Sequence, residues 1–312
     1  GLAMLDVSTG EFAITEASGK DAEETIFAEI CSLNAKECVI TPDIKKQKSL
    51  IQRFKTQRDL AITFVDNKAQ SISTWESGGY SLKVPINKVL LNHFSALALE
   101  GSGCMEYPVG LQAAGTLLSY VLETQRTQLD YINEIRYFSV DDVLLIDPET
   151  RYNLELTDTQ RLGQRGKERT LLNIMDLTLT PMGGRLLRKW IVRPSKNLKE
   201  ISMRLDIVEE LTHDTIIRGD LKKILSCIRD LERLAVRIGT GGANARDLLS
   251  LAESLLVIPE LKEIVSDSNC NNMKNLSSAL LDLTELTKLI MNAITDDPPP
   301  VLTEGGLIRQ GY

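Results

Sequence analysis

The sequence predicts an α/β domain followed by an all-α helical domain, and three observations support this prediction. Short apolar runs alternate with amphipathic segments from residue 1 to about residue 130, as they do in mixed α/β folds. From about residue 169 onward the pattern becomes almost continuously helical. The chain has 312 residues, and because single cores stop growing at about 250–300 residues, two domains are expected.

The first domain begins with a predicted β-hairpin. Its strands cover residues 2–7 and 11–15, and Ser8-Thr9-Gly10 supplies the polar and glycine residues of a tight turn. Further apolar runs and helical spacings predict strands over residues 38–41, 61–65 and 143–146 and helices over residues 21–33, 44–54 and 111–125. A loop from residue 101 to residue 110 precedes the last of these helices, and Asp147-Pro148 indicates a turn.

The second domain is predicted to be helical throughout. Helical spacing runs from residue 169 to residue 250 and is interrupted at Pro181, at Pro194 and at residues 239–242. Another helix is expected from residue 276 to residue 294, where apolar residues recur mainly at helical spacing. The proline-rich run that follows ends it, because proline cannot continue a helix.

The charge balance argues against tight nucleic-acid binding by the chain as a whole. The net charge is −7 and the pI about 5.2, whereas such binding needs Lys and Arg to replace the counterions of the phosphates. Two local basic groups are interpreted as solvated faces of helices and loops. They consist of Arg161, Arg165, Lys167 and Arg169, and of Arg185, Arg188, Lys189 and Arg193.

The five cysteines include no C-x-x-C pair, so neither a disulfide framework nor a zinc site is indicated, and a reducing cytoplasm is expected. The longest apolar runs are far shorter than the ~20 residues that span a bilayer, so no membrane insertion is expected. No signal peptide is present, and the chain begins at Gly1 in strand-like sequence without an initiator Met. We therefore expect an excised piece of a longer protein.

A series of motifs carries the strongest functional signal. Residues 147–156 read DPETRYNLEL, residues 180–190 read TPMGGRLLRKW, and residues 230–234 read DLERL. Together with residues 170–176 and 204–211, and in this order, these segments resemble the core, or lever, region of the MutS family. Other parts of the chain resemble the neighbouring regions of the same family: residues 5–12 and 113–125 resemble its connector domain, and residues 298–308 resemble the segment before its clamp.

The resemblance covers essentially the whole chain and implies two domains. Residues 1–130 correspond to a connector domain, which in the family has a ribonuclease-H-like fold. Residues 131–312 correspond to the first half of a lever domain that ends before the clamp. The residues that the resemblance marks as structural are Asp6, Gly10, Arg151, Asn153, Leu154, Thr180, Pro181, Met182, Gly183, Arg185, Leu205, Asp230, Leu231, Glu232 and Arg233.

The resemblance also implies a function. In the family, the full-length protein is a homodimer that clamps mismatched duplex DNA, couples recognition to binding and hydrolysis of ATP with Mg, and recruits MutL through the connector. This chain is therefore expected to be a non-catalytic coupling module without a cofactor or metal of its own. Because the lever is incomplete, we also expect exposed apolar helix faces and self-association.

The motifs have physical interpretations of their own. Pro181 suits the first turn of a helix, where its missing N–H costs nothing, and it favours an extended residue before it. Gly183 and Gly184 are expected to let that helix approach a neighbour closely. Asp230 can cap the helix that follows it, while Glu232 and Arg233 face solvent or a partner helix.

Two motifs of the full-length family are not found. The P-loop, G-x-x-x-x-G-K-[S/T], holds nucleotide phosphates, but Gly19-Lys20 and Gly166-Lys167 are both followed by an acidic residue. The glycine-rich residues 239–242 have no following Lys and indicate a helix boundary. Phe27-Ala28-Glu29 has the letters of the family's mismatch-reading Phe-x-Glu. We interpret this match as chance, because Phe27 lies on the apolar face of a predicted helix.

A ribonuclease-H-like fold raises the alternative of a metal-dependent nuclease. Nucleases of this fold hold two metal ions with carboxylates, and Asp6, Glu23 or Glu24, and Asp66 stand at suitable elements. Against this, Asp6 belongs to the connector hairpin motif, where it is not known as a metal ligand, and Asp66-Asn67-Lys68 is typical of an ordinary strand-to-helix turn. Fold likeness is also only an analogy for activity.

The resemblance also leaves a choice between two branches of the family. The branch of the family that suppresses recombination typically lacks the N-terminal domains, so the connector here favours the repair branch. His93 and His213 have no nearby set of metal-binding residues and are interpreted as surface or helix-packing residues.

Overall fold

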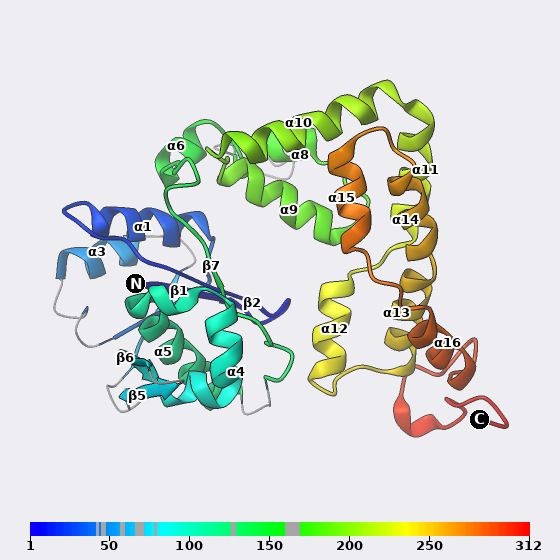
Figure 1. Cartoon of the computed structure of the whole chain (residues 1–312), viewed down its shortest axis with the longest axis horizontal. Helices are drawn as coiled ribbons and strands as arrows, with labels where there is room; N and C mark the ends of the chain where they lie inside the picture. The colour runs from blue at the N-terminus through cyan, green and yellow to red at the C-terminus, as the bar shows by residue number, and fades with distance from the viewer. Residues whose placement is uncertain are drawn as a thin grey trace. The chain divides into compact units, whose positions relative to one another are not determined.

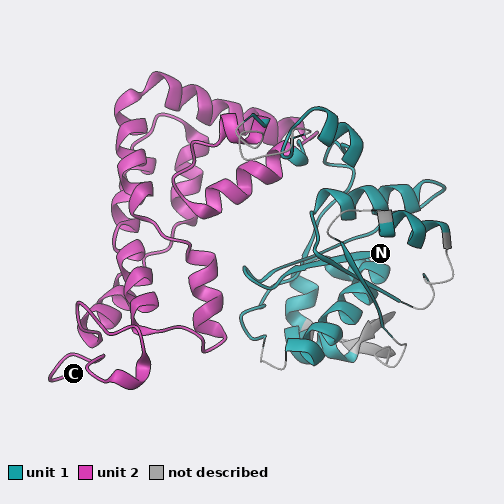
Figure 2. Ribbon diagram, turned by 180° about the vertical axis from the view of Figure 1, so that it is seen from behind, with its two compact units in different colours: residues 1–170, 192–194 teal, residues 171–191, 195–312 magenta. Residues whose placement is uncertain are grey.

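The computed structural model describes residues 1–41, 44, 48–56, 60–65, 72–77, 80–125, 129–159 and 169–312. The chain divides into two compact units, which are coloured separately in Figure 2. Unit 1 consists of Gly1–Thr170 together with Val192–Pro194, and unit 2 of Leu171–Ile191 and Ser195–Tyr312. The predicted division at residue 130 concerns the domains of a family rather than these units, and it stays a prediction.

Unit 1 contains the strands of the described chain. The hairpin of β1 (Leu2–Asp6) and β2 (Glu11–Thr15) is antiparallel, with Leu2 opposite Thr15 and Asp6 opposite Glu11, as the sequence predicts (Figure 1). The short β7 (Arg136–Tyr137) pairs in parallel with β2. Two further pairs are the parallel β3 (Glu37–Ile40) and β4 (Ala61–Phe64), and the antiparallel β5 (Ile72–Ser77) and β6 (Tyr80–Asn87).

The helices of unit 1 lie between and after these strands. They are α1 (Ala22–Ser32), α3 (Lys48–Thr56), α4 (Lys88–Gly101), the 3-10 turn η2 (Cys104–Glu106), α5 (Pro108–Gln125) and α6 (Pro148–Asn153). Apolar spacing in α5 predicts its buried face: Leu111, Ala114 and Leu118 are fully buried against Phe12 and Ile14 of β2. A second apolar cluster joins α1, α3 and β3 through Phe27, Ile40, Leu50 and Phe54.

Two predictions near the end of unit 1 are wrong. Residues 143–146 form no strand: Val143 is an isolated bridge residue, and the amide of Leu144 donates to the carbonyl of Pro194 at 2.8 Å. Asp147-Pro148 is the start of α6 rather than a turn between elements. The Asp147 carboxylate caps α6 by accepting from the amide of Thr150 at 2.9 Å, and Pro148 occupies the first turn, where its missing N–H costs nothing.

The described part of unit 2 is helical, apart from isolated bridge residues at Ser195, Ile294 and Ile308. In chain order the helices are α8 (Leu171–Met175), α9 (Pro181–Val192), α10 (Leu198–His213), α11 (Thr215–Cys227), α12 (Leu231–Gly239), α13 (Ala245–Leu256), α14 (Ile258–Ser266), α15 (Asn271–Ala279), α16 (Thr284–Ala293) and the 3-10 turn η3 (Leu302–Glu304). The predicted breaks at Pro181, Pro194 and residues 239–242 are all confirmed.

Side-chain caps explain where four of these helices begin. Asn197, Asp214 and Asp230 each accept from backbone amides at the start of α10, α11 and α12, and Asn244 and Asp247 form a capping box at α13. The single helix predicted over residues 276–294 is wrong. The chain instead breaks between α15 and α16, where Asp282 accepts from the amide of Thr284 at 2.9 Å.

Two apolar clusters hold unit 2 together. The larger one joins α11, α14 and α15 through Ile224, Leu261, Val265 and Met273, with Ile207 of α10 against it. The other joins α13 and α16 through Ala245, Ala252, Ile290 and Ile294. After α16 the chain turns back, so that Ile294 pairs with Ile308 in an isolated bridge.

Candidate functional site

Three residues of the resemblance, Arg185, Asp230 and Glu232, meet in unit 2. Arg185 of α9 donates two hydrogen bonds to Asp230, from Nη1 to Oδ2 at 2.8 Å and from Nη2 to Oδ1 at 2.7 Å. Its Nε also donates to Glu232 at 3.1 Å. The same Asp230 caps α12 by accepting from the amide of Arg233 at 3.4 Å. We call Arg185, Asp230 and Glu232 the α9–α12 clamp.

The clamp is half-buried, which strengthens its charge interactions. The side chains of Arg185 and Asp230 are 29% and 17% exposed. The guanidinium of Arg185 holds the pKa of Asp230 below its ordinary value, and Asp230 in turn raises the pKa of Arg185. A bidentate arginine–carboxylate pair of this kind also fixes direction, because both guanidinium nitrogens must face both carboxylate oxygens. The arrangement can position helices; it offers no nucleophile or base to a substrate.

The start of α9 is built as the sequence predicts, with one correction. Pro181 opens the helix, and the hydroxyl of Thr180 accepts from the amide of Gly183 at 3.0 Å. Gly183 was expected to let α9 approach a neighbouring helix. A Cβ atom there would instead lie 3.0 Å from Oγ1 of Thr180, so the glycine makes room for the cap of its own helix. The prediction for Gly183 was therefore wrong, because the glycine accommodates Thr180 and not a neighbouring helix.

The remaining unit 2 residues of the resemblance are apolar and divide into two kinds. Met182 and Leu231 pack against the cluster that joins α11, α14 and α15. Leu205 of α10 is 60% exposed and contributes to no described core cluster. The sequence does not distinguish these cases, because each residue lies at helical spacing with other apolar residues.

In unit 1 the residues of the resemblance are separated. The carboxylate of Asp6 accepts from the amide and hydroxyl of Ser8, at 2.8 and 2.7 Å, and so shapes the hairpin turn. Gly10 closes that turn with a φ of +78°, a conformation that favours glycine. Arg151 of α6 donates to the carbonyl of Cys31 at the end of α1, at 2.6 Å. Asn153 ends α6 and Leu154 follows it, 61% exposed.

The sequence pattern did not predict one buried ion pair of unit 1. Glu29 of α1 is fully buried and forms an ion pair with Arg193 at 3.0 Å. Arg193 was interpreted as part of a solvated basic face, and that was wrong, because its side chain is only 8% exposed. The sequence does contain a local indication that Glu29 is buried. It lies three residues after Ile26 and four before Leu33, so it is next to the apolar face of the helix. Phe27, in contrast, is buried in the α1–α3 cluster as predicted.

Two carboxylates of the nuclease alternative, Asp6 and Glu24, are engaged in other contacts. Asp6 binds Ser8, as described, and Glu24 forms a bidentate pair with Arg53, both distances being 2.8 Å. Asp66 lies outside the described residues. Among the residues that the structure describes, no group of three or more His, Cys, Asp and Glu side chains could hold a metal ion.

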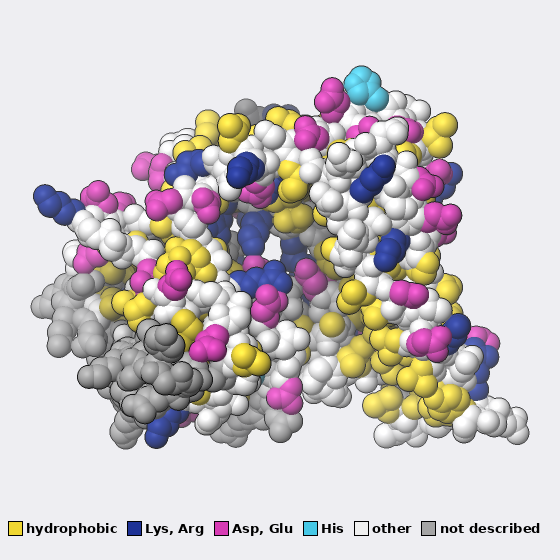
Figure 3. Space-filling view, viewed as in Figure 1, with side chains coloured by type: hydrophobic (Ala, Val, Ile, Leu, Met, Phe, Trp, Pro, Cys, Tyr) yellow, Lys and Arg dark blue, Asp and Glu magenta, His cyan; other side chains and the backbone are white. Residues whose placement is uncertain are grey.

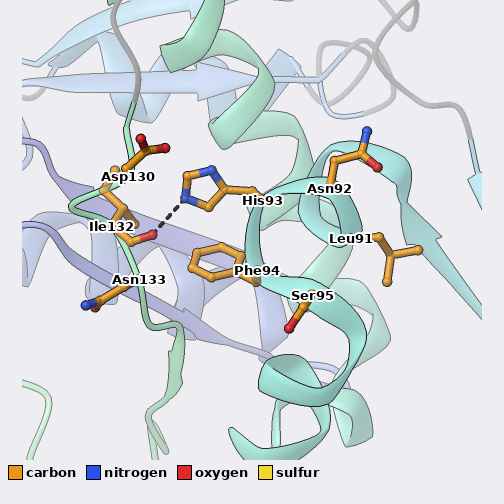
Figure 4. A pocket seen from close by; sticks show the side chains of 8 residues that line it. All are labelled: Leu91, Asn92, His93, Phe94, Ser95, Asp130, Ile132 and Asn133. Carbon is orange, nitrogen blue, oxygen red and sulfur yellow. Dashed lines mark hydrogen bonds between the residues drawn. The ribbon is translucent and has the colours of Figure 1, made fainter.

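A surface cavity of about 470 Å³ lies beside α4 (Figure 4). His93 closes one side, and its Nε2 donates to the carbonyl of Ile132 at 2.7 Å. Asn92, Ser95 and Asn133 bring polar groups to the lining, and Asp130 a carboxylate. This bond confirms that His93 is a packing residue. The hydroxyl of Ser95 accepts from the amide of Ala98 at 3.4 Å, and among the described residues no hydrogen bond joins it to His93.

The basic groups and the glycine-rich segment can be placed only in part. Arg161, Arg165, Lys167 and Gly166 lie outside the described residues. Lys189 is exposed on α9 and Arg188 is half-buried. Residues 239–242 follow the predicted role: α12 ends at Gly239, and Gly241 has a φ of +70°.

Exposed apolar side chains gather at the α13–α16 end of unit 2 (Figure 3). Leu256, Leu281 and Leu289 are 57%, 71% and 55% exposed. In the part of the chain that the structure describes, no helix is both long enough and apolar enough to cross a membrane. Self-association through these apolar side chains stays a prediction.

Comparison with family models matches nearly the whole chain. The model described as MutS domain II matches residues 1–133, and the model described as MutS domain III matches residues 149–310. The clamp therefore lies in the part that resembles domain III, and the hairpin of Asp6 and Gly10 in the part that resembles domain II.

Curated proteins named DNA mismatch repair protein MutS are similar over the full length of the chain. The protein from Methanococcoides burtonii is 36% identical over 316 residues, which are 100% of this chain and 34% of that protein. Those from Symbiobacterium thermophilum and Synechococcus elongatus are 35% and 37% identical, again over 100% of this chain and 34% of each protein. The chain spans about a third of the length of these relatives.

Proposed function

The chain belongs to the MutS family, of which it contains domains II and III, and we propose that it acts as a non-catalytic connector and lever module of a mismatch-repair protein. Within unit 1, residues 1–130 correspond to the connector, whose fold we propose to be ribonuclease-H-like. Unit 2 corresponds to the first part of the lever. The module transmits a mechanical shift and performs no chemical step.

The observation that carries this proposal is the α9–α12 clamp. A helix transmits a rigid-body shift only if its neighbours follow it, and a half-buried bidentate pair resists rotation and sliding better than an apolar contact does. Around the clamp, α10, α11, α14 and α15 share one apolar cluster, which adds stiffness. The charged groups of the clamp bind one another, as is expected for residues that position helices rather than catalyse a reaction.

The partners belong to the proposal as well. In the full-length protein we expect a homodimer that binds mismatched duplex DNA and uses ATP with Mg in a part outside this chain. MutL is the partner proposed for the connector. The five cysteines are all free thiols, which supports a reducing compartment such as the cytoplasm.

Binding of the N-terminal domain of the cognate MutL tests the docking role. Interferometry at low salt should give saturable binding to the whole chain, and hydrogen exchange should then locate the protected amides. We expect slower exchange in unit 1 only, with unit 2 as the internal reference. Protection confined to unit 2 would contradict a docking face on the connector.

Nucleotide and DNA titrations test the non-catalytic role. The chain should bind matched and mismatched duplexes equally and weakly, and it should show no micromolar affinity for ATP. A micromolar ATP site, or a clear preference for the mismatch, would refute the view that these activities need the rest of the protein.

A further inference from the structure

The connection between α9 and α10 contains a three-residue corner that belongs to unit 1. Val192 is the last residue of α9, and Val192–Pro194 groups with unit 1 although most of α9 and all of α10 belong to unit 2 (Figure 2). Val192 is buried, with 5% of its surface exposed. This corner is therefore the part of the connection that packs within unit 1.

The corner is held by a buried ion pair. Nη2 of Arg193 lies 3.0 Å from Oε2 and 3.1 Å from Oε1 of Glu29, and Ser32 donates from its hydroxyl to Oε2 at 3.2 Å. An unpaired carboxylate is costly to bury, so Glu29 depends on these donors. Burial raises the pKa of Glu29, and Arg193 partly offsets this. Removing Arg193 leaves an uncompensated buried acid.

Other contacts seat the same corner. The guanidinium of Arg193 lies over the ring of Phe138, 4.9 Å from its centroid, and the carbonyl of Pro194 accepts from the amide of Leu144 at 2.8 Å. Arg151 holds the end of α1, next to Glu29, through the carbonyl of Cys31. The arginine is thus contacted from a second direction, and the helix that carries the carboxylate is held near its end.

The connection between α9 and α10 is short and conformationally restricted. Pro194 has a restricted φ, and Asn197 caps α10 by accepting from the amides of Lys199 and Glu200 at 3.0 and 3.4 Å. A displacement of the end of α9 therefore cannot be absorbed by rearranging a long loop, and it is resisted directly by the contact with α1.

We propose that Glu29 and Arg193 form a latch that keeps the α9–α10 corner seated on α1, so that the corner and α1 open as one cooperative unit. The proposal deepens the coupling role proposed above and rests on it, because the latch is where movement of α9 would reach the connector. The pair is a positioning device and contacts no substrate.

Native-state hydrogen exchange of the whole chain at increasing urea tests the latch, with residue-level fragmentation to follow single amides. In the wild type, the amide of Leu144 and the amides in the last turn of α1 should show one common opening free energy. Arg193→Met should separate them and speed exchange at Leu144 at least tenfold. If Arg193→Met does not fold, Arg193→Lys, which keeps the charge without the planar fork, gives the same comparison.

Two controls separate a latch from a merely stabilising pair. Arg185→Met removes the ion pairs of Arg185 with Asp230 and Glu232 and should leave Leu144 and α1 opening together. The double variant Glu29→Gln/Arg193→Met buries no charge, so it should restore protection of α1 but not the common opening. Common opening of Leu144 and α1 in Arg193→Met would overturn the latch. This result is independent of the MutL footprint, so the two proposals fail separately.

Discussion

Replacing Asp230 tests the α9–α12 clamp most directly, because this one carboxylate both caps α12 and pairs with Arg185. Loss of the cap costs about 1 kcal/mol. Loss of hydrogen bonds to a charged partner costs about 1.5–3 kcal/mol, and the 17% exposure of Asp230 calls for little discount for solvent screening. We therefore expect Asp230→Ala to lower the free energy of unfolding of unit 2 by about 2–4 kcal/mol.

Matched variants separate the contribution of the cap from that of the ion pair. Asp230→Asn keeps a capping oxygen but removes the charge, so it should lose the ion-pair part only. Arg185→Met should lose a similar part while leaving the cap in place. Asp220→Asn breaks an exposed pair with Lys223 and should leave the urea midpoint unchanged.

Urea unfolding followed by the fluorescence of Trp190, which lies on α9, measures these differences. The chain has two tryptophans, so a Trp75→Phe background leaves Trp190 as the only reporter. If Asp230→Ala loses no more than the cap contribution of about 1 kcal/mol and Arg185→Met matches the wild type, the clamp does not hold the helices together.

The remaining predictions concern pH, the hairpin and the end of α16. Because Arg185 lowers the folded pKa of Asp230 below 3.8, its contribution to stability should be present above about pH 3.8 and disappear as pH falls through the folded pKa. Urea midpoints between pH 6 and pH 2 should therefore fall less steeply for Asp230→Asn than for the wild type, and parallel curves would contradict this. Gly10→Ala places a Cβ at a φ of +78°, 3.3 Å from Tyr131, and should destabilise unit 1 by about 1–2 kcal/mol in thermal unfolding. Gly101→Ala, which has open space and no positive φ, should be neutral or stabilising, so equal losses would refute the strain argument. Arg309 donates to the carbonyls of Met291 and Ile294 at 2.9 and 2.7 Å, so Arg309→Met should speed hydrogen exchange in the last turn of α16, whereas unchanged exchange there would show that the carbonyls need no such donor.

Local patterns in the sequence determined the order of elements and many of their ends. The hairpin of β1 and β2, the helices α1 and α5, and the breaks at Pro181 and Pro194 all follow from spacings of two to four residues and from turn residues. Asp230 as a cap follows for the same reason, because a cap acts on amides two or three residues away. The resemblance to MutS likewise depends only on the order of motifs along the chain.

Other elements could not be predicted from local patterns in the sequence. The β5–β6 pair was missed because β6 contains Pro85, which argues against a strand, and the two-residue β7 is too short to show alternation. The break between α15 and α16 interrupts a spacing that continues to look helical.

The tertiary structure alone decided which charged residues work together. Arg185 and Asp230 are 45 residues apart in the sequence, and Glu29 and Arg193 are 164 apart. Arg185 and Arg193 lie in the same stretch with the same apparent charge pattern, yet one forms a half-buried clamp within unit 2 and the other a buried pair in unit 1. A side chain's burial and partner depend on which distant segments the fold brings to it. For that reason the sequence established the family and the elements, whereas only the packed structure identified the clamp and the latch.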